Sequence, residues 1–317
     1  MMKIYLVGGN QDFLETMQKS LVASGLMDVS LVVQPKISPQ ALAEKAADCE
    51  IMVASPSGFD SLSKEHLDGL PKLKFISTVS VGTDWIDLSA AKERGIVVSN
   101  EKGVNAESVA EHCFGLIMDL AKRITESDRG IRERGEYSPS PYMGTELYEK
   151  TLGIIGTGDI GQRVARMAKG FAMNVIGVNK SNKAIEGISL VPFEKLLKES
   201  DVIAVTLPLT AETENLLSEK EFAMMKKGVL VASTSREMII NKEAVVAAVH
   251  SGQVAGYGFD AEIMVPIPQG DPYLTSERIV ITPHTASMTE AADAGYSAMT
   301  IENIKAFLVD KPVRQVA

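Results

Sequence analysis

Along most of this chain, short runs of apolar residues alternate with stretches in which apolar residues recur every three or four positions. The runs have the length of buried β-strands, and the periodic stretches have the spacing of one helix face. In the first part of the chain, strands are expected at 4–7, 29–33, 51–54 and 75–77, and helices at 13–23, 39–47 and 62–67. Strands that alternate with helices predict a parallel sheet covered by helices on both faces.

The alternation returns after a polar stretch at 126–149, which we expect to be irregular. Strands are expected at 152–155, 174–177, 202–206, 229–232, 257–259 and 279–281, and helices at 164–170, 193–199, 219–225, 242–251 and 290–308. Between the two series, residues 106–124 form a helical pattern that is apolar on more than one face. Such a helix is usually buried at a domain or subunit boundary. The pattern therefore predicts an α/β protein with two doubly wound parallel sheets.

A glycine fingerprint, Gly156-x-Gly158-x-x-Gly161, lies between an expected strand and a helical pattern. In this context Gly156 permits a tight turn, Gly158 lets the backbone approach a pyrophosphate, and Gly161 lets the helix pack closely on the strand. The N-terminus of the following helix would face the phosphates. We interpret the fingerprint as a dinucleotide-binding turn of the Rossmann type; the alternative is a purely structural tight turn.

The composition narrows the range of partners and compartments. The 317 residues suffice for two domains of ordinary size, and the net charge of −9 with no basic cluster argues against nucleic acid and membrane surfaces as partners. No stretch approaches the roughly 20 apolar residues of a membrane span. Cys49 and Cys113 lie in apolar patterns and are expected to be buried thiols in a reducing compartment. We therefore expect a cytoplasmic protein.

Several motifs occur along the chain in a characteristic order. Besides the fingerprint they are Val81-Gly82-Thr-Asp84-x-Ile-Asp87, Gly103-Val-Asn105-Ala-x-Ser108-Val-Ala-Glu111, Leu207-Pro208-Leu-Thr210-x-x-Thr213, Ser233-Thr234-Ser235-Arg236 and Thr282-Pro283-His284-x-Ala286. With these motifs the chain resembles the D-isomer-specific 2-hydroxyacid dehydrogenases, and among them the glyoxylate/hydroxypyruvate reductases, over nearly its whole length.

The resemblance implies a fold and an activity. It implies two Rossmann-like domains, with a dinucleotide-binding domain at 102–288 inserted into a substrate domain formed by 1–101 and 289–317. It implies a homodimer built around the helix at 106–124. The implied reaction transfers a hydride between NAD(P)H and a small 2-oxo acid, with a D-2-hydroxy acid as the reduced product. By the same resemblance, the backbone N–H groups of Val81 and Gly82 would bind the substrate carboxylate.

This reaction requires a cation for the carboxylate and an acid for the developing alkoxide. Arg236 suits the first task because its planar guanidinium stays charged and binds a carboxylate at two points. His284 suits the second because an unperturbed histidine has a pKa of about 6.5. Each follows an expected strand at the carboxyl end, where α/β sheets bind ligands. Of the other three histidines, His66 and His250 are expected to be solvated and His112 to be structural.

The chain departs from the family pattern at one catalytic position. The family glutamate that pairs with the histidine is replaced by Val265. Glu262 is a candidate substitute, and Glu237 a weaker one. The departure keeps open a second function, a catalytically impaired dinucleotide-binding sensor or regulatory protein on the same fold. A third alternative is an enzyme of this fold that acts on another small anion, such as formate or phosphonate.

The choice of cofactor depends on the end of the strand expected at 174–177. NAD-specific relatives carry an acidic residue there, which binds the ribose hydroxyls and repels a 2′-phosphate. This chain has Asn179, Lys180 and Ser181, all of which can donate to a phosphate, so we favour NADP(H) over NAD(H). Alternatively, Lys180 is solvated and NAD binds with Asn179 on its ribose. The remaining cofactor contacts expected by position are Asp159, Ile160, Leu207, Pro208, Thr213, Thr234 and Asp260. No cluster at metal-ligand spacing is visible.

Overall fold

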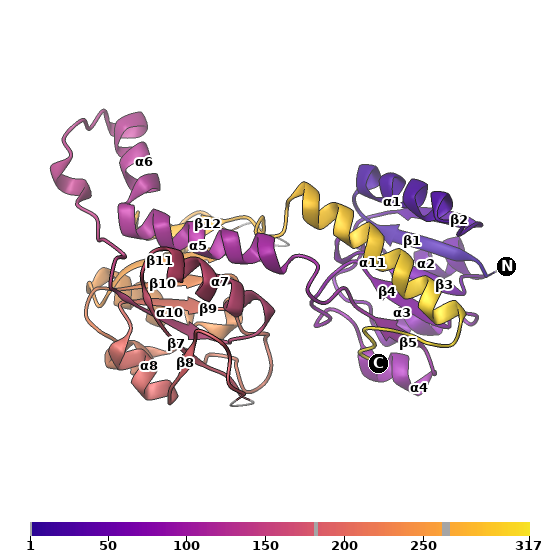
Figure 1. The fold of residues 1–317 in the computed structure, drawn as a ribbon. Helices are drawn as coiled ribbons and strands as arrows, with labels where there is room; N and C mark the ends of the chain where they lie inside the picture. The colour runs from indigo at the N-terminus through magenta and orange to yellow at the C-terminus, as the bar shows by residue number, and fades with distance from the viewer. Residues whose placement is uncertain (1, 181–182, 262–266) are drawn as a thin grey trace. The chain divides into compact units, whose positions relative to one another are not determined.

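The computed structural model describes residues 2–180, 183–261 and 267–317, and the chain divides into two compact units. The first unit joins residues 1–105 to 289–317, and the second comprises residues 106–288. Figure 1 shows the first unit in indigo, purple and yellow, because it contains both ends of the chain. The second unit is therefore inserted into the first along the sequence.

The first unit is a five-stranded parallel sheet with strand order β2-β1-β3-β4-β5. Its elements are β1 (Ile4–Gly8), α1 (Gln11–Ala23), β2 (Val29–Val33), α2 (Pro39–Ala46), β3 (Ile51–Ala54), α3 (Lys64–Asp68), β4 (Phe75–Thr78), α4 (Leu88–Glu93), β5 (Val97–Ser99) and α11 (Glu290–Leu308). Because side chains alternate along a strand, Ile51 and Val53 pack with α1 and α11, whereas Met52 and Ala54 pack with α2, α3 and α4. Both faces of the sheet are thus covered by helices.

The second unit is a seven-stranded parallel sheet with strand order β12-β11-β10-β9-β6-β7-β8. Its elements are α5 (Ala106–Lys122), α6 (Ile124–Arg134), β6 (Thr151–Ile155), α7 (Asp159–Gly170), β7 (Asn174–Val178), β8 (Ser189–Leu190), α8 (Phe193–Glu199), β9 (Val202–Val205), α9 (Glu219–Met224), β10 (Val229–Ser233), α10 (Lys242–His250), β11 (Val254–Asp260) and β12 (Ile279–Thr282). Helices α5 and α7 cover one face, and α8, α9 and α10 cover the other (Figure 1). The strand order reverses between β6 and β9, which is where α/β sheets of this kind bind ligands.

The predicted α/β class with two doubly wound parallel sheets is confirmed. The prediction of an irregular stretch at 126–149 is wrong, because α6 occupies its first part. This helix is mostly polar, so it lacks the apolar repeat by which helices are predicted; an ion pair between Arg132 and Asp128 spans one of its turns, and Gly135 ends it at φ +65°. Cys49 and Cys113 are buried free thiols, as expected. Across the described ranges, no helix is both long and apolar enough to span a bilayer.

Candidate active site

The glycine fingerprint forms the turn between β6 and α7. Gly156 has φ +101°, and a Cβ added to it would lie 2.8 Å from the carbonyl oxygen of Thr206. A Cβ on Gly161 would lie 2.2 Å from the carbonyl oxygen of Gly156. A Cβ on Gly158 would instead meet nothing within 4 Å. The local packing therefore leaves no room for a side chain at Gly156 or Gly161, whereas Gly158 borders open space.

That open space lies at the start of α7. Gly158 is the N-cap residue and provides no side-chain acceptor for the first amides of the helix, which begins at Asp159 and Ile160. Unpaired amides at a helix N-terminus are suited to bind an anion. The residues at this turn thus fit the pyrophosphate of a dinucleotide.

The end of β7 brings Asn179 and Lys180 close to two other loops. The Asn179 side chain donates a hydrogen bond to Thr157 Oγ1 at 2.9 Å, inside the fingerprint turn. Lys180 Nζ pairs with Glu212 Oε2 at 2.6 Å, and both side chains are largely exposed. Glu212 was not predicted from the sequence, since it lies 32 residues from Lys180. Ser181 lies outside the described residues.

The loop after β9 contains three of the expected cofactor residues. A Cβ on Gly156 would lie 2.9 Å from Leu207 Cδ2, so Leu207 covers the fingerprint turn. Thr213 Oγ1 donates to the carbonyl oxygen of Pro208 at 2.8 Å and accepts from the backbone N–H of Thr210 at 2.7 Å. The Thr213 hydroxyl therefore closes this loop on itself.

The loop after β10 carries Thr234 and Arg236. The backbone N–H of Thr234 and the hydroxyl of Ser235 both donate to the carbonyl oxygen of Val205, at 3.3 and 3.0 Å, which ties the loop to β9. The Thr234 hydroxyl is buried beside the Cys113 thiol, a weak partner. Arg236 follows in extended conformation and is half-buried.

The turn after β12 carries His284, and Asp260 at the end of β11 holds this turn. One Asp260 oxygen accepts hydrogen bonds from Thr282 Oγ1 at 2.6 Å and from the backbone N–H of Thr285 at 2.9 Å. The other accepts from the backbone N–H of Ala286 at 3.0 Å. His284 itself is exposed, and its φ of +54° is uncommon for a residue with a side chain.

Arg236 and His284 share one edge of the sheet. They follow β10 and β12, which flank β11. With neighbouring strands roughly 4.8 Å apart, the two strand ends lie about 10 Å from each other. Glu262 and Val265 lie outside the described residues. Among those the structure describes, no group of histidine, cysteine and acidic side chains could hold a metal ion.

In the first unit, Val81 and Gly82 follow β4. Asn100 Nδ2 donates to the carbonyl oxygen of Val81 at 2.8 Å, and Ser80 Oγ and Trp85 Nε1 donate to that of Gly82 at 2.7 and 3.1 Å. Within the described part of the chain, the amides of Val81 and Gly82 donate no hydrogen bond. Hydrogen bonds therefore fix their carbonyl groups, whereas their N–H groups have no acceptor among the described residues.

The remaining histidines differ in burial. The expectation that His66 is solvated is wrong: the ring is buried, with Nδ1 2.9 Å from Ser63 Oγ and Nε2 2.9 Å from the carbonyl oxygen of Ile37. His66 helps to cap the N-terminus of α3, a role that the polar residues around it in the sequence do not indicate. His250 is exposed. His112 Nε2 lies 2.8 Å from Thr282 Oγ1, two residues before His284.

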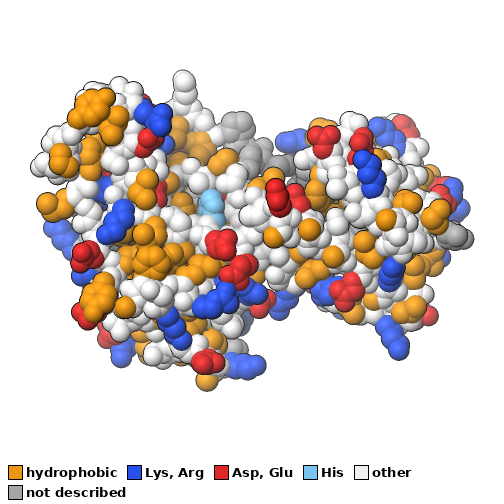
Figure 2. Space-filling model, turned by 45° about the horizontal axis from the view of Figure 1, so that its top comes forward, with side chains coloured by type: hydrophobic (Ala, Val, Ile, Leu, Met, Phe, Trp, Pro, Cys, Tyr) orange, Lys and Arg blue, Asp and Glu red, His pale blue; other side chains and the backbone are white. Residues whose placement is uncertain are grey.

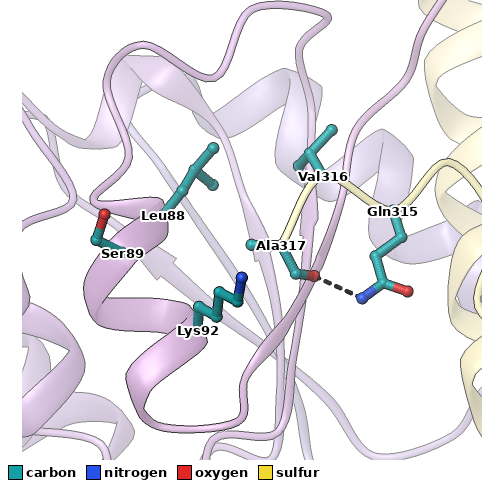
Figure 3. Close-up of a pocket in the computed structure, with 6 residues that line it drawn as sticks. All are labelled: Leu88, Ser89, Lys92, Gln315, Val316 and Ala317. Atoms are coloured by element: carbon teal, nitrogen blue, oxygen red, sulfur yellow. Dashed lines mark hydrogen bonds between the residues drawn. The ribbon is translucent and has the colours of Figure 1, made fainter.

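The pocket in Figure 3 is formed by residues of the first unit alone. Its volume is about 530 Å³, and it is bordered by α4 and the C-terminal segment, with Lys92 and Gln315 among its lining residues. The Gln315 side chain donates to the carbonyl oxygen of Ala317 at 3.0 Å. None of the predicted site residues lines this pocket.

Comparisons with known proteins agree with these features. The family model "D-isomer specific 2-hydroxyacid dehydrogenase, NAD binding domain" matches residues 114–286. The chain is 36% identical to a glyoxylate reductase of Korarchaeum cryptofilum over 277 residues, which are 85% of this chain and 83% of the relative. It is 37% identical to a D-3-phosphoglycerate dehydrogenase of Archaeoglobus fulgidus over 83% of this chain but only 50% of that protein.

Two solved structures are similar over essentially their full length. An acyclic imino acid reductase in complex with NADPH and D-Arg has a TM-score of 0.88 and 28% identity, with all of both chains covered. A glyoxylate reductase from Paecilomyes thermophila has a TM-score of 0.86 and 29% identity, with 99% of this chain and 98% of that chain covered. By its sequence and its fold, the chain belongs to the D-isomer-specific 2-hydroxyacid dehydrogenase family.

Proposed function

We propose that this protein reduces a small, unphosphorylated 2-oxo acid to the D-2-hydroxy acid. The observation that carries the proposal is the common sheet edge of Arg236 and His284, in the unit that also contains the open fingerprint turn at Gly158. A bound dinucleotide supplies the hydride. Arg236 binds the substrate carboxylate with its guanidinium, and His284 donates the proton to the carbonyl oxygen.

The carboxylate that we propose as the partner of His284 is that of Glu262. The family glutamate is replaced by Val265, and Glu262 remains our candidate substitute. Glu237 follows Arg236 directly and is the weaker candidate. The alternative function, a dinucleotide-binding sensor, is disfavoured because the relatives that match most of this chain are reductases and dehydrogenases by name.

The proposal of an unphosphorylated substrate rests on the loops of the first unit. The segments after β1, β3 and β4, residues 8–10, 55–58 and 79–82, contain no lysine or arginine. Lys36, in the loop after β2, is paired with Asp60 at 2.9 Å. A substrate phosphate would therefore lack a free cation in these segments, so we expect glyoxylate or hydroxypyruvate to be preferred over a phosphorylated 2-oxo acid.

For the cofactor we propose NADP(H) over NAD(H). The proposal is supported by Asn179 and Lys180 where NAD-specific enzymes carry an acid, and by the NADPH bound to a structural neighbour. Glu212 opposes it, because its carboxylate already pairs with Lys180. We therefore expect Glu212→Gln to increase the preference for NADPH over NADH, and Lys180→Ala to decrease it, as measured by kcat/KM with each cofactor.

We further propose a cytoplasmic homodimer formed around α5 and α6. The second unit exposes several large apolar side chains, and Figure 2 shows apolar side chains gathered on it. Those at or near these helices are Ile124, Ile131, Tyr137, Met143, Tyr148 and Phe171. Sedimentation of the purified protein tests this proposal; a monomer at micromolar concentration would contradict it.

The activity is tested by following oxidation of NADPH and of NADH with glyoxylate, hydroxypyruvate and a phosphorylated 2-oxo acid. Reduction of NADP+ and of NAD+ with formate tests the alternative that the enzyme acts on another small anion. We expect Arg236→Ala and His284→Ala each to lower kcat/KM by about 100-fold or more. Lys195→Ala and His250→Ala, which change exposed side chains outside α5 and α6, are the controls. Dinucleotide binding without turnover of any substrate would instead support the sensor.

A further inference from the structure

We infer that His112 is a positioning residue, which acts through Thr282 and Asp260 to hold the turn that carries His284. The inference rests on the proposed function, because it assigns His112 a part in orienting the proposed acid. Nothing in the sequence motif around His112 indicates this role. Three elements meet here: α5 supplies His112, β11 ends at Asp260, and β12 ends at Thr282.

The direction of the hydrogen bonds follows from the number of available protons. Thr282 Oγ1 donates to Asp260 Oδ1 at 2.6 Å, and a hydroxyl has a single hydrogen to give. In the contact between His112 Nε2 and Thr282 Oγ1, at 2.8 Å, the histidine must therefore be the donor. His112 Nε2 lies 3.8 Å from Asp260 Oδ1, so it reaches the carboxylate through the hydroxyl. His112 thus carries its proton on Nε2.

The other end of this chain of hydrogen bonds is the backbone around His284. Asp260 accepts from the backbone N–H groups of Thr285 and Ala286, the two residues that follow His284. On the preceding side, the backbone N–H of His284 bonds to the carbonyl oxygen of Thr282 at 3.1 Å. His284 is held at φ +54°, a conformation that persists only where its surroundings enforce it. The hydrogen bonds that the Asp260 carboxylate accepts from Thr285 and Ala286 provide that restraint.

His112 fixes the direction of the hydrogen bond between the Thr282 hydroxyl and Asp260. Its N–H occupies the acceptor side of the Thr282 hydroxyl, so the hydroxyl hydrogen stays directed at Asp260. Without that donor the hydroxyl can rotate, and Asp260 loses one of its three hydrogen bonds. The side chain of His112 is only 22% exposed, so little water can replace it. Because these hydrogen bonds lead to the turn that carries the proposed acid, we expect the change to alter kcat more than KM.

The test compares a variant that lacks the donor with one that keeps it. We expect His112→Leu to lower kcat about tenfold with less than about a twofold change in KM for the 2-oxo acid, as for a slightly misplaced catalytic group. His112→Gln, whose amide N–H can replace Nε2–H, should restore most of the rate. His250→Leu, at an exposed histidine, is the matched control. Equal losses for His112→Leu and His112→Gln would overturn the inference.

A double-mutant cycle tests whether Thr282 is the link. Thr282→Val removes the hydroxyl, so His112→Leu should have no further effect in the Thr282→Val background. Thr282→Ser, which keeps the hydroxyl, should behave like the wild type. If the losses of His112→Leu and Thr282→Val multiply, the two side chains act separately and the inference is wrong.

A final measurement separates this inference from the proposed function. In a ¹H–¹⁵N spectrum of histidine side chains, the wild type should show a slowly exchanging Nε2–H of His112 that is absent from Thr282→Val. This signal does not depend on turnover, so a protein that reduces no 2-oxo acid would refute the proposed function alone. Absence of the protected proton from the wild type would overturn the inference itself.

Discussion

The carboxyl group of Glu101 links burial in the first unit to the pH dependence of its stability. Glu101 follows β5 and has no exposed surface. One of its oxygens accepts a hydrogen bond from the Thr300 hydroxyl on α11, and the other has no partner among the described residues. Burial raises the pKa of Glu101 from 4.5 to about 9, although the Thr300 hydrogen bond and the charge of Arg314 lower it. The folded protein therefore holds a proton that the unfolded chain releases.

The sign and size of the effect follow from this difference. A carboxyl whose pKa is raised by folding favours the folded state at low pH, and this contribution is lost as the pH rises through the folded pKa. Between the two pKa values each pH unit costs about 1.4 kcal/mol. From pH 6 to pH 8, Glu101 should therefore lower the free energy of unfolding by about 3 kcal/mol. Glu101→Gln is neutral at every pH and should remove this dependence.

The single tryptophan of the chain, Trp85, reports on the same unit. Its indole N–H donates to the carbonyl oxygen of Gly82, so its fluorescence should change when this unit unfolds. We would measure urea unfolding by Trp85 fluorescence at several pH values for the wild type, Glu101→Gln and the exposed control Glu93→Gln. The free energy of unfolding of Glu101→Gln should rise relative to both others as the pH increases. Parallel pH dependences for all three proteins would refute the reasoning.

Two further predictions concern local packing. Gly161→Ala should destabilise the second unit by about 3 kcal/mol, because the new methyl group meets the carbonyl of Gly156. Gly158→Ala should leave the stability unchanged and weaken dinucleotide binding about tenfold. Thermal unfolding and cofactor titration separate the two effects; equal stability losses would contradict the packing argument. His66→Leu should cost about 1–3 kcal/mol by Trp85 fluorescence, because it leaves the buried carbonyl of Ile37 unpaired. An unchanged unfolding midpoint would refute that role of His66.

The elements that could be predicted from the sequence are those whose cause is local. The fingerprint of Gly156 and Gly161 predicts a turn because backbone conformation and close approach depend on the glycines themselves. The helix α6 lacks an apolar repeat, so no periodicity revealed it. The pairing of Lys180 with Glu212 and the contact of His112 with Thr282 join residues 32 and 170 positions apart. Such contacts depend on strand order, which the pattern of apolar residues does not specify.

The family glutamate that Val265 replaces and the carboxylate of Asp260 would both act on His284. By the resemblance, that glutamate would both orient the histidine and favour its protonated form. If the chain His112–Thr282–Asp260 already orients the turn, restoring the glutamate supplies only the second effect. Val265→Glu should then leave the maximal kcat/KM within about twofold and extend activity to higher pH by about one unit, the shift that an adjacent carboxylate typically produces.

The pH profiles of kcat/KM for the wild type and Val265→Glu measure both effects, and Val265→Gln, which adds bulk without charge, is the control. If Val265→Glu is active to higher pH and its maximal kcat/KM is unchanged, the orientation of His284 does not require the glutamate. A large gain at every pH, shared by Val265→Gln, would mean that the wild-type histidine is poorly oriented despite the hydrogen bonds of Asp260. In that case holding the backbone of a catalytic turn does not suffice to hold its side chain.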